Sequence, residues 1–207
     1  YNVRNTHRAV GTRFSSEITR LYGMKGLSEG HVHVRLRGSA GQSLGAFLCQ
    51  GITLEVFGDA NDYVGKGLSG GTIIVRPTVS SPLTSQQNSI IGNTVLYGAT
   101  SGRLLAAGQA GERFAVRNSG AHVVVEGCGS NGLEYMTGGM AVILGKVGSN
   151  FGAGMTGGMA FVLDTEGDFA KMANPDSIVW QRLDSAYWEE QLKSLVAAHA
   201  QATDSAW

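Results

Sequence analysis

The sequence repeats one short phrase, a glycine followed at once by a run of β-branched and other apolar residues. The phrases begin at Gly30, Gly51, Gly71, Gly92, Gly120, Gly139 and Gly158, with successive spacings of 21, 20, 21, 28, 19 and 19 residues. The longest spacing contains an extra strand-like piece, Arg103-LLAAG, which can account for its excess. A period of about 20 residues is typical of stacked repeats, so the sequence predicts a solenoid.

Each unit is expected to form a strand, a turn, a short strand and another turn. A unit of about 20 residues is too short for a strand and a crossover helix, and a short strand cannot bury its apolar face alone. A parallel β-helix meets both requirements because every coil pairs with the next. The alternative, an antiparallel sandwich, is disfavoured because it would show tight Asn-Gly or Asp-Gly hairpins every 8–12 residues, whereas Asn131-Gly132 is the one such dipeptide in the sequence.

The composition supports a folded solenoid. Glycine contributes 31 of 207 residues but proline only 3, which argues against collagen and flexible linkers. We expect glycine to occupy structural corners that a Cβ atom would forbid. The candidate corner glycines are Gly51, Gly65, Gly67, Gly71, Gly120, Gly139, Gly152, Gly154 and Gly158. The 16 basic and 16 acidic residues balance, which disfavours nucleic-acid binding, and no apolar run is long enough to predict a membrane span.

Two cysteines, Cys49 and Cys128, lie far apart and belong to no CxxC motif. This pattern excludes a disulfide framework and predicts two buried free thiols in a reducing cytoplasm. The chain begins at Tyr1 without a signal-peptide pattern, so we interpret it as a fragment or processed product rather than an exported precursor.

The two ends of the chain depart from the repeat. We expect a GXGXG β-helix domain over 1–170, with an irregular entry segment at 1–29, and a helical tail at 171–207. Ser16-EITRLYG is compatible with a short helix or an irregular first coil. Asn174-Pro175-Asp176 predicts a helix start, and Trp188, Leu192, Leu195, Val196 and His199 form an amphipathic stripe expected to cap or flank the last coil. Pro77-TVSSPLTSQQNS indicates an excursion loop or a contact arm.

Three segments match the dinucleotide pattern GxGxxG, beginning at Gly65, Gly127 and Gly152. In a nucleotide-binding fold this pattern opens a helix, whereas here it recurs in the corners of the repeat, so we expect no cofactor site in this chain. Gly41-QSLG formally matches a nucleophile elbow around Ser43, with His122 and His199 downstream. The elbow needs a strand-to-helix setting that the repeat does not provide, so we predict no catalytic residue.

A polar group marks the first coil, where His31, His33, Arg35 and Arg37 alternate with apolar residues. His31 and His33 have the spacing of two metal ligands, but a third ligand is not evident, and we favour a docking face for another domain. Asp59, Asn61 and Asp62 crowd the next corner, where they are expected to cap their own turns rather than to coordinate a cation.

Several longer phrases carry a family resemblance: Asn5-THRAVGTRFSSEI, Gly38-SAGQSLGAFL, Gly58-DANDYVGKGLSGG, Gly92-NTVLYGATSG, Ala110-GERFAVRNSGA, Glu134-YMTGG and Asn150-FGAGMTGGMAFVLD. From about Asn5 to Asp164 the chain resembles the C-terminal GXGXG domain of the glutamate synthase large (alpha) subunit. One departure is Ser130-Asn131-Gly132-Leu133, where the family has an Asp-His-Gly-Cys phrase, so a role tied to that His or Cys does not carry over.

The resemblance implies a right-handed parallel β-helix without a catalytic residue, flavin, iron–sulfur cluster or metal of its own. It implies a scaffold that packs the glutaminase, central and FMN/iron–sulfur synthase domains of one polypeptide, which makes glutamate from glutamine and 2-oxoglutarate. A small electron-donating subunit is a further implied partner, and NADPH, NADH and ferredoxin all remain open as electron donors.

Two other interpretations remain at this stage. One is a stand-alone GXGXG subunit, like that of formylmethanofuran dehydrogenase or a related amidotransferase. The other is an independent enzyme using Ser43 or the His31/His33 pair.

Overall fold

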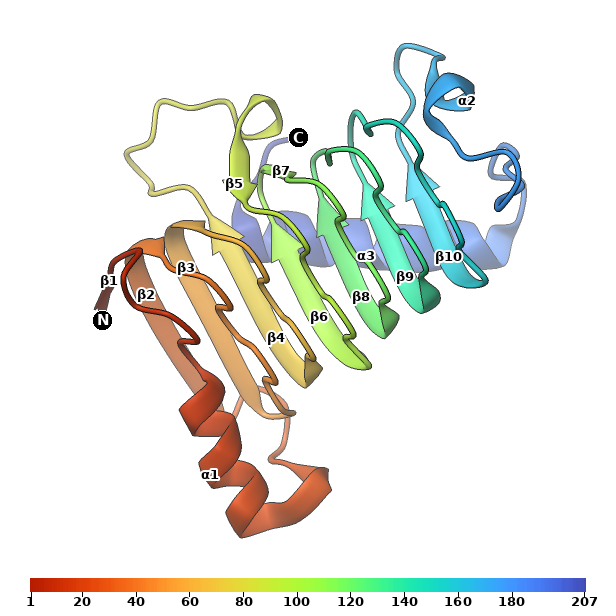
Figure 1. The fold of residues 1–207 in the computed structure, drawn as a ribbon. Helices are drawn as coiled ribbons and strands as arrows, with labels where there is room; N and C mark the ends of the chain where they lie inside the picture. The colour runs from red at the N-terminus through yellow and green to blue at the C-terminus, as the bar shows by residue number, and fades with distance from the viewer.

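The computed structural model describes residues 1–207 and shows a stack of coils whose strands lie side by side in one twisted sheet (Figure 1). The strands are β1 (Asn2–Val3), β2 (Val32–Ala40), β3 (Ile52–Ala60), β4 (Ser69–Arg76), β5 (Ser89–Ile91), β6 (Ser101–Ala106), β7 (Gln109–Ala110), β8 (Ser119–Val125), β9 (Thr137–Ile143) and β10 (Gly157–Val162). The helices are α1 (Thr12–Tyr22), α2 (Phe169–Met172), α3 (Ala186–Thr203) and the 3₁₀ turns η1 (Gly23–Lys25) and η2 (Ser85–Gln87).

Seven long strands form what we call the sheet wall, in the order β2-β3-β4-β6-β8-β9-β10, with β1 paired to the outer edge of β2. The neighbouring strands pair in parallel, so the chain makes one full coil between each strand and the next. The expected all-β parallel β-helix of about seven coils is therefore confirmed.

The core is a column of apolar side chains inside the coils. Alternate residues of a strand point to opposite faces of the sheet, so each coil contributes its inward residues to the same stack. One register row of this stack is Val34, Leu54, Ile73, Leu104, Val123 and Ala141. These six residues are buried, and they belong to a continuous cluster of 35 buried residues.

The strand predicted for the fourth coil is wrong. Gly92-NTVLYG is not its strand, because Thr94, Leu96 and Gly98 have φ values of 58°, 58° and 67°, which are incompatible with an extended strand. The strand is β6, which contains most of the supposed extra piece Arg103-LLAAG. The additional length lies instead between β4 and β5, in the polar segment that leaves the coil near Pro77 (Figure 1).

The helical predictions had mixed outcomes. Residues 16–22 are helical, as part of α1. The predicted helix start at Asn174 is wrong, because α2 has already ended and the next helix begins at Ala186. Asn174 makes a turn instead: its side-chain oxygen accepts from the Asp176 N–H, and its side-chain amide donates to Asn150 of the last coil. These tertiary contacts use the groups that a helix cap would need.

Helix α3 crosses the outer face of the sheet wall behind the strands, rather than only flanking the last coil (Figure 1). Leu195 packs on a second apolar cluster formed by Leu105, Val124, Met140 and Val142. Trp188 lies against Phe161 of β10, with ring centroids 6.3 Å apart. The helix contacts β4, β6, β8 and β9, so the outer face of β2 and β3 is left without a helical cover. The division at residue 170 stays a prediction.

Candidate functional site

Opposite the sheet wall lies a second wall with an unusual backbone, which we call the ladder wall. It consists of residues 43–47, 63–67, 94–98, 113–117, 131–135 and 150–154. In each segment the first, third and fifth residues have positive φ: Ser43, Gly45, Phe47, Tyr63, Gly65, Gly67, Thr94, Leu96, Gly98, Arg113, Ala115, Arg117, Asn131, Leu133, Tyr135, Asn150, Gly152 and Gly154. A Cβ atom on Gly65 would lie 3.4 Å from Ile73 Cδ1, so this wall faces the sheet across the core.

Hydrogen bonds between coils explain how this backbone is held. The Phe47 N–H donates forward to the carbonyl of Lys66 in the following coil, at 2.8 Å. The Gly65 N–H donates backward to the carbonyl of Leu44 in the preceding coil, also at 2.8 Å. Alternating donation of this kind satisfies backbone groups that would otherwise be orphaned. The stack therefore imposes positive φ even where the residue is not glycine.

The third residue of each ladder segment points into the core. Gly65 is buried, and a Cβ there would lie 2.8 Å from Leu96 Cδ2, so a side chain at this position would collide with its neighbour. Leu96 and Leu133 hold the same position in other coils and are fully buried. A non-glycine residue in this region carries a strain of about 1–2 kcal/mol, which core burial offsets.

The candidate corner glycines fall into three groups. Gly65, Gly67, Gly152 and Gly154 belong to the ladder wall. Gly51, Gly139 and Gly158 have φ values of 95°, 85° and 88° and lie at or beside the start of a sheet-wall strand. Gly71 and Gly120 lack positive φ, but a Cβ on Gly120 would collide with the carbonyl oxygen of Thr100. At these two positions the neighbouring coil lies too close to leave room for a side chain, which explains why the residue is glycine.

The three GxGxxG segments do not have the geometry of a dinucleotide site, which requires a strand followed by a helix. Those at Gly65 and Gly152 lead from the ladder wall into β4 and β10, and the one at Gly127 leads from β8 into the next ladder segment. None of them opens a helix.

The residues of the formal nucleophile elbow are dispersed. Ser43 lies on the ladder wall, where its N–H donates to the carbonyl of Asp62 at 2.8 Å. His122 lies on the exposed outer face of β8, where partial burial and the Arg103 guanidinium lower its pKa. His199 is buried on α3. The core separates Ser43 from both histidines, so the chain does not assemble a Ser–His pair.

The polar face predicted on the first coil extends along the exposed side of β2. His33 Nε2 and Arg35 Nε each lie 3.0 Å from Oε2 of Glu55 on β3. The Glu55 side chain is only 9% exposed, whereas that of Arg35 is 70% exposed. His31 and Arg37 are exposed as well. Sequence reasoning missed Glu55, although it lies 20 residues after Arg35, which is one repeat.

The acidic corner at the end of β3 bonds to its own turn and to the neighbouring coils. Asp59 accepts a hydrogen bond from the Ser39 hydroxyl at 3.1 Å, and Asp62 Oδ1 accepts from the Asn93 N–H at 2.8 Å. Asn61 accepts from the Asp62 N–H. No group of three or more His, Cys, Asp or Glu side chains in the structure has a metal-binding arrangement.

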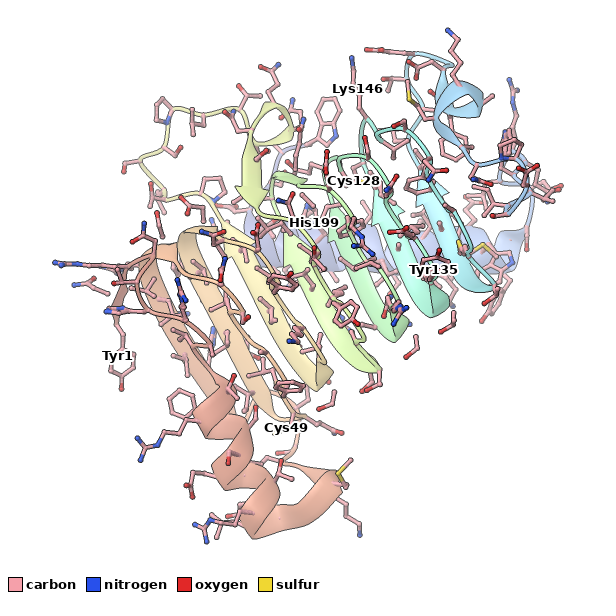
Figure 2. The ribbon with its side chains drawn as sticks, in the orientation of Figure 1. Tyr1, Cys49, Cys128, Tyr135, Lys146 and His199 are labelled. Atoms are coloured by element: carbon pink, nitrogen blue, oxygen red, sulfur yellow. The ribbon has the colours of Figure 1, made fainter.

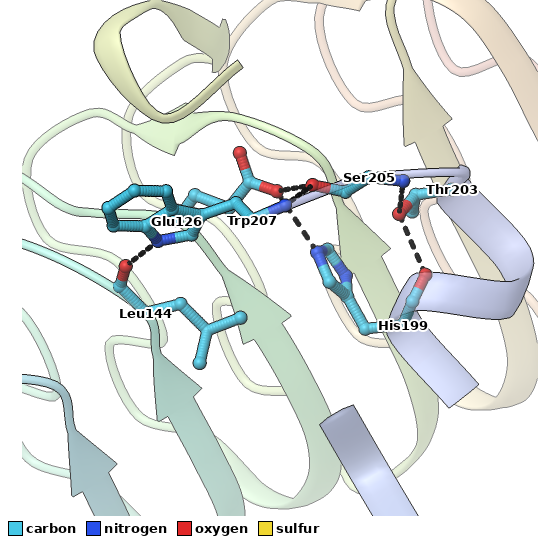
Figure 3. Close-up of polar contacts among 6 residues, drawn as sticks. All are labelled: Glu126, Leu144, His199, Thr203, Ser205 and Trp207. Carbon is cyan, nitrogen blue, oxygen red and sulfur yellow. Dashed lines mark hydrogen bonds and ion pairs between the residues drawn. The ribbon is translucent and has the colours of Figure 1, made fainter. Parts of the chain in front are cut away.

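A buried polar cluster attaches α3 to the solenoid, and the sequence analysis did not predict it (Figure 3). Glu126, just after β8, and His199 of α3 are each about 1% exposed, with Oε1 and Nε2 3.3 Å apart. The Ser205 hydroxyl donates to the same Glu126 oxygen at 2.5 Å. The Trp207 indole donates to the Leu144 carbonyl. These contacts hold the end of the chain against β8 and β9.

The surroundings of Glu126 shift its pKa in opposite directions. Burial acts to raise the pKa of Glu126, but hydrogen bonds from His199, Ser205 and Ser85 outweigh it and leave the pKa below its ordinary value. Glu126 Oε2 and His199 Nδ1 lack hydrogen-bond partners. Nearby, a cavity of about 410 Å³ lies between the Pro77 excursion and the chain end, and its lining includes Arg76, Ser85 and Trp207.

The two cysteines are free and buried, as predicted. Burial raises the pKa of Cys128 to about 12. Figure 2 places Cys49 near α1 and Cys128 in the upper part of the view, over the later coils of the stack. The structure also contains no helix with the length and apolar character needed to span a membrane.

Comparison with known proteins agrees with the resemblance seen in the sequence. The chain is 68% identical over 205 residues to the NADPH glutamate synthase large chain of Azospirillum brasilense. It is 53% identical over 205 residues to ferredoxin-dependent glutamate synthase 2 of Synechocystis, and 50% identical over 204 residues to the NADPH glutamate synthase large chain of Bacillus subtilis.

These alignments cover 98–99% of this chain but only 13–14% of each relative. The chain therefore corresponds to one part of much longer proteins. A family model described as the GXGXG motif matches residues 1–207. The chain thus belongs to the GXGXG motif family, and its resemblance to the GXGXG domain of glutamate synthase large chains is confirmed.

Proposed function

We propose that this chain is a non-catalytic scaffold domain of a cytoplasmic glutamate synthase, packing the glutaminase domain against the central and FMN/iron–sulfur synthase domains. High identity across nearly the whole chain supports the assignment to glutamate synthase. In this proposal the flavin and the cluster belong to other domains of the polypeptide, and the GXGXG domain contributes rigidity and contact surface.

The observation that carries the scaffold role is the uncovered end of the sheet wall. Helix α3 covers the outer face from β4 onward, whereas β2 leaves His33 and Arg35 at the surface, paired with the largely buried Glu55 of β3. His31 and Arg37 extend this polar face beyond the ion pairs. Charged residues at the edge of an interface set register more than affinity, so these side chains suit the alignment of a neighbouring domain.

The test uses the full-length enzyme carrying His31→Glu and Arg37→Glu. These two positions are preferred to Arg35, because reversing the charge of Arg35 would place a carboxylate beside Glu55 and destabilise the domain itself. The readout is the ratio of glutamine hydrolysed to glutamate formed, together with thermal unfolding.

We expect the double variant to hydrolyse glutamine in excess of glutamate formation without a change in the unfolding of this domain. Lys171→Glu with Arg182→Glu, at exposed cations outside the polar face, serves as the matched control. Coupled activity at the parental level in the His31/Arg37 variant would contradict the proposed docking face.

A further inference from the structure

A second exposed surface lies on the ladder wall, on the side of the solenoid away from α3. Five successive coils each contribute one large side chain to it, in the order Phe47, Lys66, Tyr97, Arg117 and Tyr135. We call this row the aromatic–cation stripe, because aromatic and cationic residues alternate along it. Neighbouring parallel strands lie about 4.8 Å apart, so the row extends over roughly 19 Å.

Cation–π contacts join three neighbouring members of the stripe, and Lys66 makes a similar contact within its own ladder segment. The Arg117 guanidinium lies 6.0 Å from the ring centre of Tyr97 and 5.9 Å from that of Tyr135. Lys66 lies 5.9 Å from the Tyr63 ring. Phe47 is 55% exposed and Tyr135 is 49% exposed, and Figure 2 shows Tyr135 on the side facing the viewer. Neither Lys66 nor Arg117 has an acidic partner within ion-pair distance.

The backbone conformation indicates that three of these side chains are not needed for folding. Phe47, Arg117 and Tyr135 occupy the fifth position of their ladder segments, at φ values of 58°, 54° and 56°. Gly67 and Gly98 occupy the same position in other coils, where φ is 63° and 67°. Glycine adopts this conformation without strain, so large exposed residues here act against the stability of the coil.

Apart from Lys66, the residues of the stripe are of the types that dominate protein interfaces. Tyrosine, phenylalanine and arginine are enriched at interface centres, and most interfacial binding energy comes from a few such residues. We propose that the aromatic–cation stripe docks an acidic surface of another domain of the same polypeptide. This inference rests on the proposed scaffold function and adds a second docking face to it.

Charge and spacing define the partner surface. The two cations stand two coils apart, which places them roughly 10 Å from each other along the solenoid. A complementary surface presents two carboxylates at that separation, with apolar side chains between them against Tyr97. The partner is thus a carboxylate-bearing protein surface, and a scaffold with docking faces on opposite walls contacts two neighbours at once.

The test introduces the photo-cross-linking residue p-benzoylphenylalanine at one of three positions of the full-length polypeptide. Tyr135 probes the stripe, Arg35 probes the polar face of β2, and Lys171 of α2 is an exposed position outside both. Cross-linked peptides are identified by mass spectrometry. The probe at position 135 is expected to label an Asp- or Glu-containing peptide of the same polypeptide that lies outside residues 1–207.

A second measurement tests the charge argument. Lys66→Glu with Arg117→Glu is expected to lower the cross-linking yield from position 135 by about tenfold. Thr94→Gly is the matched control, because it changes the same wall at φ 58° without removing an aromatic or charged group. The yield in this control should equal that of the parent.

Each other outcome overturns the inference in a distinct way. Labelling of a second polypeptide copy, or only of residues 1–207, would show that the stripe does not meet a neighbouring domain. Labelling from position 35 but not from position 135 would leave the proposed scaffold function intact and reject the second face. If neither position 35 nor position 135 labels another domain, both the scaffold function and the second docking face are rejected. An unchanged yield in the Lys66/Arg117 variant would reject the acidic partner.

Discussion

The sheet wall and the ladder wall stack with the same period but use different backbones. The sheet wall uses extended strands, with positive φ mainly at glycines near its corners, such as Gly139. The ladder wall reverses the sign of φ at every second residue and accepts Leu96, Arg117 and Tyr135 where other coils have glycine. The comparison indicates that repeat stacking, rather than local propensity, determines the ladder backbone.

The largest loss of unfolding free energy is expected from a substitution at a corner of the sheet wall. In Gly139→Val, the new Cβ would collide with the carbonyl oxygen of Ala121 and lie 2.9 Å from Asn118 Nδ2, at φ 85°. We expect this variant to lose about 3 kcal/mol or more of unfolding free energy, measured by chemical denaturation.

Gly158→Val is the companion variant. Its φ of 88° imposes similar strain, but the Cβ would mainly meet the flexible Met136 side chain, 2.7 Å away. A smaller loss of about 1–3 kcal/mol is expected. If both variants unfold like the parent, the corner assignment fails.

A comparable effect is expected at the attachment of α3. His199→Ala would leave Glu126 buried without its imidazole partner, and the loss of one member of a buried pair costs about 3 kcal/mol. We expect α3 to detach before the coils unfold, which the fluorescence of Trp188 and Trp207 would report. Leu195→Ala, on the same helix face, is the control that removes only packing.

The attachment of α3 should also depend on pH. Because the pKa of Glu126 is lowered in the folded state, its contribution is present above the ordinary glutamate pKa and is lost as the pH falls through the lowered value. The fluorescence change of α3 release should therefore appear on acidification, and Glu126→Gln should abolish this pH dependence. A parental acid profile in Glu126→Gln would exclude Glu126 as its cause.

A smaller difference in unfolding free energy is expected between buried leucines of the two walls. Leu104→Gly and Leu96→Gly remove the same atoms from fully buried positions. Glycine relieves positive φ only at position 96, where φ is 58°, so Leu96→Gly should be less destabilising by about 1–2 kcal/mol. Equal losses in denaturant titrations would show that the ladder backbone is not strained.

These leucines also show what sequence reasoning could and could not reach. The alternation of Val32, Val34 and Leu36 predicted the sheet wall, because an extended strand buries every second residue. Leu96 carries no sign of positive φ, since its conformation is imposed by hydrogen bonds to neighbouring coils. Gly65 and Gly152 were recognised as structural, but only coil-by-coil alignment would have placed Leu96 and Leu133 beside them.

Polar contacts between distant segments were the least accessible to sequence reasoning. Glu55 was within reach, because one repeat separates it from Arg35. The contact between Glu126 and His199 joins residues 73 positions apart in sequence and depends on where α3 crosses the sheet. Asn174 was misinterpreted for the same reason, because its partner Asn150 belongs to the preceding coil.

The smallest change in unfolding free energy is expected from a substitution on the exposed side of the ladder wall. Arg117→Gly removes contacts to two tyrosine rings but relieves strain at φ 54°. The two effects are each about 1 kcal/mol and oppose one another, so the unfolding free energy should change by less than about 0.5 kcal/mol. A loss of several kcal/mol would mean that Arg117 serves folding rather than docking.

Hydroxyl-radical footprinting of the full-length polypeptide tests the docking of both walls most directly. In this chain alone, Tyr135 is 49% exposed and Phe47 is 55% exposed, so both side chains are open to oxidation. If the stripe is docked, Tyr135 and Phe47 should be oxidised several-fold more slowly than their exposure implies, and His31 on the polar face should be protected as well. Oxidation of all three residues at the rates given by their exposure would contradict a scaffold that holds neighbours on both walls.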